Sequence, residues 1–155
     1  MLNIGTKAPD FSLSDATGST VSLTALLAKG PVLLYFYPAD FTPVCTKEAC
    51  MFRDRSEDLV ALGMSVVGVS PQSVETKRKF AASNRLTQIL LADPGRKVAA
   101  AYDATALLGF VVRRVTYLID RDSTIVDSAR ADLSIGAHEA LVERALSRYK
   151  STPSA

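Results

Sequence analysis

The chain has 155 residues, of which 48% are hydrophobic, which is enough for one domain with a sizeable core. Its net charge is only +2 and the charges are mixed along the chain, so the composition does not indicate nucleic-acid binding. Two cysteines are too few for a disulfide scaffold, and no apolar run approaches the roughly 20 residues of a membrane-spanning helix.

The two ends of the chain carry little patterning. The N-terminus lacks the basic and then apolar pattern of a secretory signal, so we expect a cytoplasmic, reducing compartment. A presequence for an organelle, removed from the chain, is the alternative. We expect a single domain over residues 1–150 and a frayed tail at residues 151–155, without repeats, linkers or a second domain.

Strands and helices alternate along most of the chain, and the spacing of apolar residues distinguishes them. Short apolar runs that end at proline or glycine indicate strands, and apolar residues three or four positions apart indicate helices. The expected elements are a β-hairpin over 11–23, a short helix over 24–29, a strand over 32–37, a helix over 43–62, a strand over 64–69, a helix over 74–83, a strand over 89–92, a helix over 97–102, a loop over 103–109, a hairpin of strands 115–119 and 124–128, and a helix from Ser134.

This order of elements predicts an α/β fold. The alternation of strands and helices in the middle of the chain indicates parallel pairing there. The last hairpin adds antiparallel strands, so we expect a mixed central sheet with helices on both faces.

Both cysteines follow the turn that connects the strand over 32–37 to the long helix. Thr42 suits the N-cap of that helix and Pro43 its first position, while Gly63 fits its C-terminal stop. Cys45 therefore falls in the first helical turn. There the unpaired N–H groups and the positive end of the helix dipole favour a thiolate, which is the nucleophilic form. Position alone leaves a second interpretation open, because a cysteine on an apolar stripe can simply be a small core residue.

The string from Pro38 to Cys45 has proline, threonine and cysteine at the spacing Pro-x-x-x-Thr-x-x-Cys, and thereby resembles the peroxiredoxin signature. Extended to Cys50, it is similar to the peroxiredoxin Q group, also called bacterioferritin comigratory proteins, in which a second cysteine follows five residues later. Two positions depart from the group, Val44 and Ser123, where it often has glycine. The other segments that resemble the family are 8–11, 69–71, 91–94 and 114–120.

The resemblance implies the thioredoxin fold with an N-terminal β-hairpin extension. It also implies a thiol-dependent peroxidase that reduces hydrogen peroxide and organic hydroperoxides, and that thioredoxin or a similar dithiol recycles. In this interpretation Cys45 is the peroxidatic cysteine, which becomes a sulfenic acid. Cys50 is the resolving cysteine, which forms an intramolecular disulfide with Cys45. We expect a monomer without a cofactor or a metal ion.

Three further residues take roles from the resemblance, each beside a plainer one. Thr42 would hold a peroxide oxygen or simply cap the helix, and Pro38 would shield the thiolate or simply end the strand. Arg114 would pair with the thiolate and polarise the peroxide, although an arginine at a strand start is usually a surface charge. We favour Arg114 over Arg113, because a shift of one residue turns the side chain to the opposite face.

The remaining polar residues suggest no second site. Glu48 is a candidate to orient Arg114. His138, the single histidine, is expected at the surface, and the basic run 77–79 is expected to be a solvated helix face. Two cysteines and one distant histidine do not make a structural zinc site.

Two alternatives to a peroxidase remain. One is a general thiol–disulfide oxidoreductase, but its usual Cys-x-x-Cys spacing is absent, and Thr42 and Arg114 would have no purpose. The other is a redox sensor or chaperone without enzymatic activity, whose oxidised form exposes apolar surface to a partner.

Overall fold

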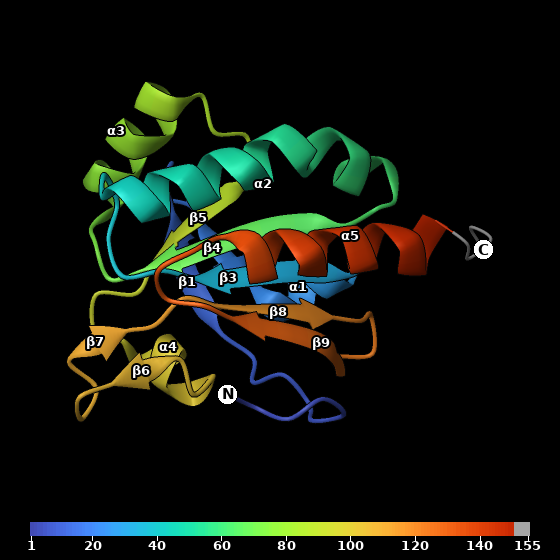
Figure 1. The fold of residues 1–155 in the computed structure, drawn as a ribbon. Helices are drawn as coiled ribbons and strands as arrows, with labels where there is room; N and C mark the ends of the chain where they lie inside the picture. The colour runs from blue at the N-terminus through green and yellow to red at the C-terminus, as the bar shows by residue number, and fades with distance from the viewer. Residues whose placement is uncertain (151–155) are drawn as a thin grey trace.

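The computed structural model describes residues 1–150, which form nine strands and five helices (Figure 1). Seven strands make one sheet in the order β2-β1-β5-β4-β3-β8-β9, and the other two pair separately. The elements are β1 (Ser12–Asp15), β2 (Thr20–Ser22), α1 (Leu23–Leu27), β3 (Val32–Phe36), α2 (Pro43–Ala61), β4 (Ser65–Ser70), α3 (Val74–Asn84), β5 (Ile89–Ala92), α4 (Lys97–Ala101), β6 (Thr105–Ala106), β7 (Val111–Val112), β8 (Val115–Ile119), β9 (Ile125–Arg130) and α5 (Gly136–Lys150).

The pairing of the strands is mixed, as the sequence predicts. β3, β4 and β5 are parallel neighbours. β8 pairs with β3 in the antiparallel sense and β9 continues that hairpin, while β1 and β2 form an antiparallel hairpin on the other edge. The mixed sheet with helices on both faces and an N-terminal hairpin is the α/β architecture that the sequence predicts.

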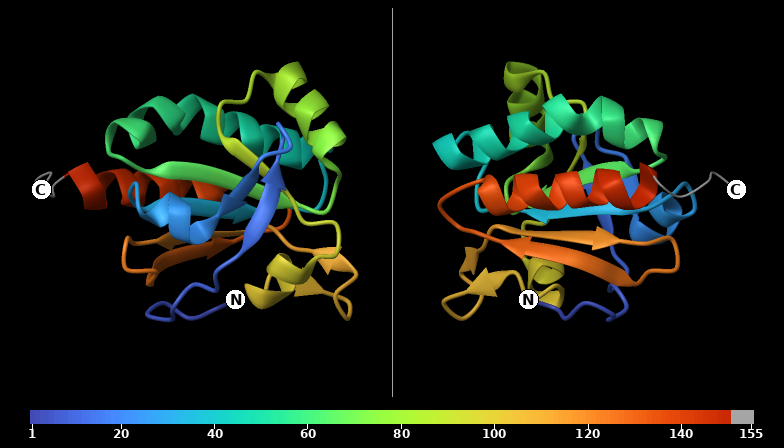
Figure 2. Two further views of the ribbon diagram at one scale, coloured as in Figure 1. Left: turned by 180° about the vertical axis from the view of Figure 1, so that it is seen from behind. Right: turned by 45° about the vertical axis from the view of Figure 1, so that its right-hand side comes forward.

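Two apolar layers enclose the sheet. All five residues of β3 are buried, because side chains that alternate along this central strand enter different layers. Leu33 and Tyr35 pack with residues of α2, α3 and α5, whereas Val32, Leu34 and Phe36 pack with residues of α1 and α4. In Figure 2, α2 and α5 accordingly lie together on one side of the sheet and α1 on the other.

Helix α2 ends where the sequence predicts. Gly63 adopts φ 80°, a left-handed conformation that glycine adopts without strain, and its N–H donates to the carbonyl of Val60 at 2.9 Å. Met64 then donates to Leu59 at 3.1 Å, which completes the cap. The helix is thereby fixed at its far end, and its other end carries the cysteines.

Two boundaries differ from the prediction. Strand β6 lies inside the stretch expected to be only a loop, and it pairs with β7. Leu107 and Leu108 turn this hairpin with φ 52° and 58°, where a type I′ turn would favour asparagine and glycine, so the usual sequence signal is missing. The last helix begins at Gly136 rather than Ser134. The tail 151–155 lies outside the described residues.

Candidate active site

Cys45 lies in the first turn of α2, directly above the end of β3. Its residue is 1% exposed and belongs to the apolar layer that also holds Tyr35, Tyr37 and Phe52. Thr42 precedes the helix with φ −85° and ψ 150°, the extended conformation of an N-cap residue. The predicted helix start is therefore confirmed, and the sulfur lies at the helix N-terminus inside an almost water-free layer.

Arg114 meets this sulfur from the segment that joins β7 to β8. Its Nη1 donates to Cys45 Sγ at 2.7 Å, and its Nε donates to the carbonyl of Asp132 at 2.8 Å. The arginine is only 6% exposed, so its charge is poorly screened by water. Arg114 therefore places a fixed cation in direct contact with the sulfur of Cys45.

Arg113 points elsewhere, as the alternation of side chains predicts. Its Nη2 pairs with Asp132 Oδ2 at 2.5 Å at the protein surface. Hydrogen bonding to Arg113 holds the pKa of the Asp132 carboxyl below its ordinary value. The expected contact of Arg114, rather than Arg113, with the cysteine is thus confirmed.

The hydrogen bonds of the turn before Cys45 differ from the expectation. Thr42 stands at the N-cap position, but its hydroxyl does not cap the helix and instead donates to the carbonyl of Ala39 at 3.0 Å. A hydroxyl has two lone pairs, so this bond leaves Thr42 able to accept from a bound peroxide. Pro38 is half-buried and its carbonyl accepts from Gln72 Nε2 at 3.1 Å. Phe41, with φ 65°, adds local strain next to Thr42.

Glu48 lies one turn after Cys45 and is completely buried. Within residues 1–150, neither of its carboxylate oxygens has a hydrogen-bond partner. Burial raises the pKa of Glu48 to about 8, against the opposing effect of the Arg114 cation. Glu48 is therefore near enough to Arg114 to affect it electrostatically. We expected Glu48 to orient the arginine, but no hydrogen bond joins the two side chains.

His138 is buried in α5, so its expected surface position is wrong. Its Nε2 lies 3.0 Å from the carbonyl of Ala131 and its Nδ1 lies 2.8 Å from Thr116 Oγ1. Because a carbonyl can only accept, Nε2 carries the proton and Nδ1 accepts from Thr116. Burial also lowers the pKa of His138, so its 3.5 Å approach to Glu48 is not an ion pair between full charges.

Lys77 is likewise buried, although Arg78 and Lys79 of the same basic run are exposed as expected. Its ammonium group lies 3.4 Å from Asp40 Oδ2 and 3.3 Å from the hydroxyl of Tyr37. Tyr37 and Asp40 lie on either side of Pro38 in the sequence. Their polar side chains, next to a buried strand, were the signal that could have indicated a buried polar cluster. The partner on α3 could not be identified without the fold.

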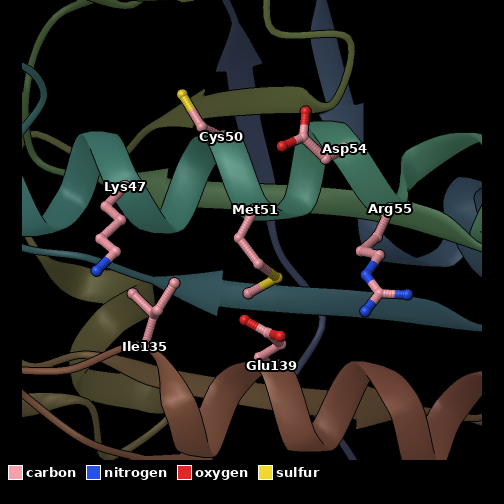
Figure 3. Close-up of a pocket in the computed structure, with 7 residues that line it drawn as sticks. All are labelled: Lys47, Cys50, Met51, Asp54, Arg55, Ile135 and Glu139. Atoms are coloured by element: carbon pink, nitrogen blue, oxygen red, sulfur yellow. The ribbon is translucent and has the colours of Figure 1, made fainter.

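Cys50 lies in the second turn of α2 and is half-buried. Both cysteines are free thiols, and α2 is continuous through them. The sulfur of Cys50 lies 4.0 Å from Asn84 Oδ1 at the end of α3. A groove of about 350 Å³ runs between α2 and α5 below this turn, and in Figure 3 the Cys50 sulfur points away from Ile135 and Glu139 on its far wall.

Residues 1–150 contain no group of three or more histidine, cysteine, aspartate or glutamate side chains able to hold a metal ion. None of the helices in this part of the chain is long and apolar enough to cross a membrane.

Comparison with known proteins shows which family the chain resembles. Residues 4–128 match the model of the AhpC/TSA family. The chain is 42% identical over 122 residues to the chloroplastic peroxiredoxin Q of Gentiana triflora, covering 78% of this chain and 56% of that protein. The crystal structure of the peroxidoxin BcpB from Mycobacterium tuberculosis is similar with a TM-score of 0.88 and 38% identity, covering 99% of this chain and 100% of that one. The bacterioferritin comigratory protein of Xanthomonas campestris has a TM-score of 0.80 and 26% identity, covering 89% and 90%.

Proposed function

The chain belongs to the AhpC/TSA family and to its peroxiredoxin Q group, so it is a thiol-dependent peroxidase, and we propose that Cys45 is its peroxidatic residue. The observation that carries this assignment is the 2.7 Å contact between Arg114 and the Cys45 sulfur. Within residues 1–150 no cation donates a hydrogen bond to Cys50: its sulfur lies 4.0 Å from the neutral amide of Asn84, and Arg53 acts on it only through its charge.

The arrangement supports direct attack of sulfur on a peroxide. The Cys45 thiolate forms an S–O bond while the O–O bond breaks, and the leaving oxygen takes a proton and departs as water or an alcohol. Arg114 would stabilise the charge that develops on the leaving oxygen. The hydroxyl of Thr42 would hold the second peroxide oxygen, and Pro38 would keep water away from the sulfur.

Cys50 would resolve the sulfenic acid, giving a disulfide with Cys45 and one molecule of water. In a continuous α-helix, residues five apart have Cα atoms about 8.7 Å from each other and side chains about 140° apart around the axis. A disulfide needs about 4.4–6.8 Å between the Cα atoms. Helix α2 is continuous over Pro43–Ala61 in the dithiol form, so its first two turns must unwind before the bond can close.

The named relatives and the chemistry of disulfides support a proposal for the substrates and the reductant. The Xanthomonas campestris protein is described for its alkyl peroxide reduction activity, which supports organic hydroperoxides beside hydrogen peroxide as substrates here. A disulfide within one chain suits a dithiol reductant such as thioredoxin, since exchange with a dithiol regenerates both thiols. Cys45, Arg114 and Cys50 all come from one chain, so we propose a peroxidase that acts as a monomer. The free thiols suit a reducing, cytoplasmic setting.

The test is to mix the reduced protein with limiting hydrogen peroxide and to follow thiol loss by stopped flow. Rapid loss of two thiols per peroxide, with an intramolecular disulfide found by mass spectrometry, is the expected result. Thiol loss at the slow rate of a free cysteine would contradict the role of Cys45. Fast loss of one thiol, without a disulfide, would contradict only the role of Cys50. Exchange with disulfides but not with peroxide would favour the general oxidoreductase.

A further inference from the structure

The buried ion pair between Lys77 and Asp40 lies outside the reacting groups. Lys77 belongs to the first turns of α3, and both side chains are completely buried. Its ammonium group donates to Asp40 Oδ2 at 3.4 Å, to the Tyr37 hydroxyl at 3.3 Å and to Ser70 Oγ. The Tyr37 hydroxyl in turn donates to Asp40 Oδ1 at 2.5 Å. Each of these groups therefore has at least one hydrogen-bond partner within the set.

Asp40 belongs to the turn 38–42, which carries the chain into the helix of Cys45. A second residue ties the same turn to the same place, because Gln72 Nε2 donates to the carbonyl of Pro38 at 3.1 Å. Gln72 Oε1 accepts from the N–H of Asp40 at 3.1 Å and from Ser70 Oγ at 2.7 Å. The turn is thus attached to the end of β4 and the start of α3 by its backbone and by its charge.

Helix α3 also contacts the turn 38–42 and the turn of α2 that holds Cys50, and both must move before the disulfide can form. Phe80 packs against the exposed Phe41 at 5.1 Å between ring centroids, and its ring lies 6.4 Å from that of Tyr37. At the last residue of the helix, Asn84 Oδ1 faces the Cys50 sulfur and the carbonyl of Asn84 accepts from Arg53 of α2 at 2.7 Å. One helix therefore touches the turn before Cys45 and the residue that would resolve it.

We propose that Lys77 is a positioning residue that keeps the turn 38–42 in the folded conformation and so opposes the unwinding that joins Cys45 to Cys50. The inference rests on the disulfide chemistry proposed above. Its physical basis is that separating a buried pair leaves an uncompensated charge, which is much more costly than losing a surface pair. If the turn leaves its place, Asp40 leaves Lys77 behind in an apolar layer.

Two reactions would then compete for the sulfenic acid of Cys45. In the folded site a second hydroperoxide can oxidise the sulfenic acid to sulfinic acid, with release of water or alcohol. In the unwound site the Cys50 thiol attacks the sulfenic sulfur and releases water. A clamp on the folded form favours the second oxidation, so removing the clamp should favour the disulfide.

The experiment compares the variants Lys77→Met and Lys79→Met after reaction with excess hydrogen peroxide. Rapid quenching and mass spectrometry give the fractions of disulfide and of sulfinic acid at each time. Methionine keeps the length of the lysine side chain without its charge. For Lys77→Met we expect the ratio of sulfinic acid to disulfide to fall about tenfold, as for a shift of that size in the folded population. Lys79→Met removes an exposed lysine that pairs only with Glu75 on the same helix, and it should match the wild type.

The pH dependence of the ratio of sulfinic acid to disulfide distinguishes a positioning role of Lys77 from a general loss of structure. Burial lowers the pKa of Lys77 to about 8, and the titratable groups that face it are Asp40, Tyr37, Asp93 and Cys45. Above about pH 8 the wild-type lysine loses its charge, so its sulfinic-to-disulfide ratio should approach that of Lys77→Met. A variant that is merely destabilised would keep its difference from the wild type across this range.

A second variant keeps the proposal testable if Lys77→Met does not fold. Asp40→Asn removes the same ion pair while it retains the volume and the acceptor for Tyr37, and we expect the same direction of change. An unchanged ratio in a folded Lys77→Met or Asp40→Asn protein would overturn the role of Lys77. If no protein, the wild type included, forms the intramolecular disulfide, it is the assignment of Cys50 that has failed.

Discussion

Cys45 and Cys50 are the same residue type in one helix, only five positions apart, yet their surroundings differ in every respect that matters for reactivity. Cys45 is 1% exposed, lies at the helix N-terminus and accepts from Arg114 at 2.7 Å. Cys50 is half-buried in the second turn, where its sulfur lies 4.0 Å from the neutral amide of Asn84 on α3. The difference teaches that the neighbours, and not the thiol itself, assign the roles in this site.

Replacing Cys45 should have the largest effect. Cys45→Ser should abolish peroxidase turnover with any reductant, because a hydroxyl does not supply an anionic nucleophile near neutral pH. A coupled assay that follows peroxide consumption measures this. More than a few per cent of residual turnover would show that another residue is the nucleophile.

Arg114→Ala should slow the peroxide step about a hundredfold, which is the usual cost of losing one preorganised donor to the developing charge. It should also decrease the thiolate absorbance of the reduced protein at neutral pH. Arg113→Ala is the matched control, since its guanidinium pairs with Asp132 at the surface, and it should change the rate less than about threefold. If the two variants exchange these effects, Arg113 is the residue that serves the sulfur.

The next prediction concerns Glu48, which lies between the two cysteines in α2, and the variant Glu48→Gln. The folded protein holds the pKa of Glu48 at about 8, whereas its ordinary value is 4.5. The folded state therefore keeps a proton that the unfolded state releases, so the free energy of unfolding should fall as pH rises from about 4.5 to about 8.

In Glu48→Gln this component of the pH dependence should be absent. At pH 8 the variant should then be more stable than the wild type by about 4 kcal/mol, because raising the pKa of Glu48 from 4.5 to about 8 corresponds to about 1.36 kcal/mol per pKa unit. Urea unfolding at pH 5 and pH 8 measures both proteins. Glu57→Gln, an exposed position on the same helix, is the control and should follow the wild type. Parallel curves for Glu48→Gln and the wild type would show that this carboxyl is not perturbed.

Cys50→Ser should change the peroxide step least, by less than about twofold, since Cys50 touches neither Arg114 nor the turn before Cys45. After one equivalent of peroxide, mass spectrometry should find a persistent sulfenic acid and, under excess peroxide, sulfinic acid. An intramolecular disulfide in this variant is impossible with one cysteine, so a covalent dimer or a sulfenamide is what would reveal another route of resolution.

The sequence was sufficient for the features that local patterns encode. The apolar stripe through Cys45, Phe52 and Leu59 predicted α2. The spacing of Arg114 to Thr116, which resembles the family, together with side-chain alternation separated Arg114 from Arg113. Ser123, in a position where the group often has glycine, adopts φ 71°, a left-handed conformation that glycine adopts more readily.

The burial of polar residues could not be predicted from the sequence. Lys77 and His138 occupy helices whose charged neighbours are exposed, and only partners from distant strands make their burial possible. Glu48 was considered only as a residue that orients Arg114, and its burial beside His138 of α5 depends on the tertiary structure. Strands β6 and β7 are too short, with two residues each, to show a periodicity.

The central claim is that α2 is intact when Cys45 meets peroxide and unwound when the disulfide closes. Hydrogen exchange of the dithiol and disulfide forms, followed by mass spectrometry across residues 42–55, tests this most directly. We predict slow exchange in the dithiol form, where the helix is continuous, and clearly faster exchange in the disulfide form. Equal protection in both forms, with helix retained from Val44 to Met51 in the disulfide form, would contradict the account.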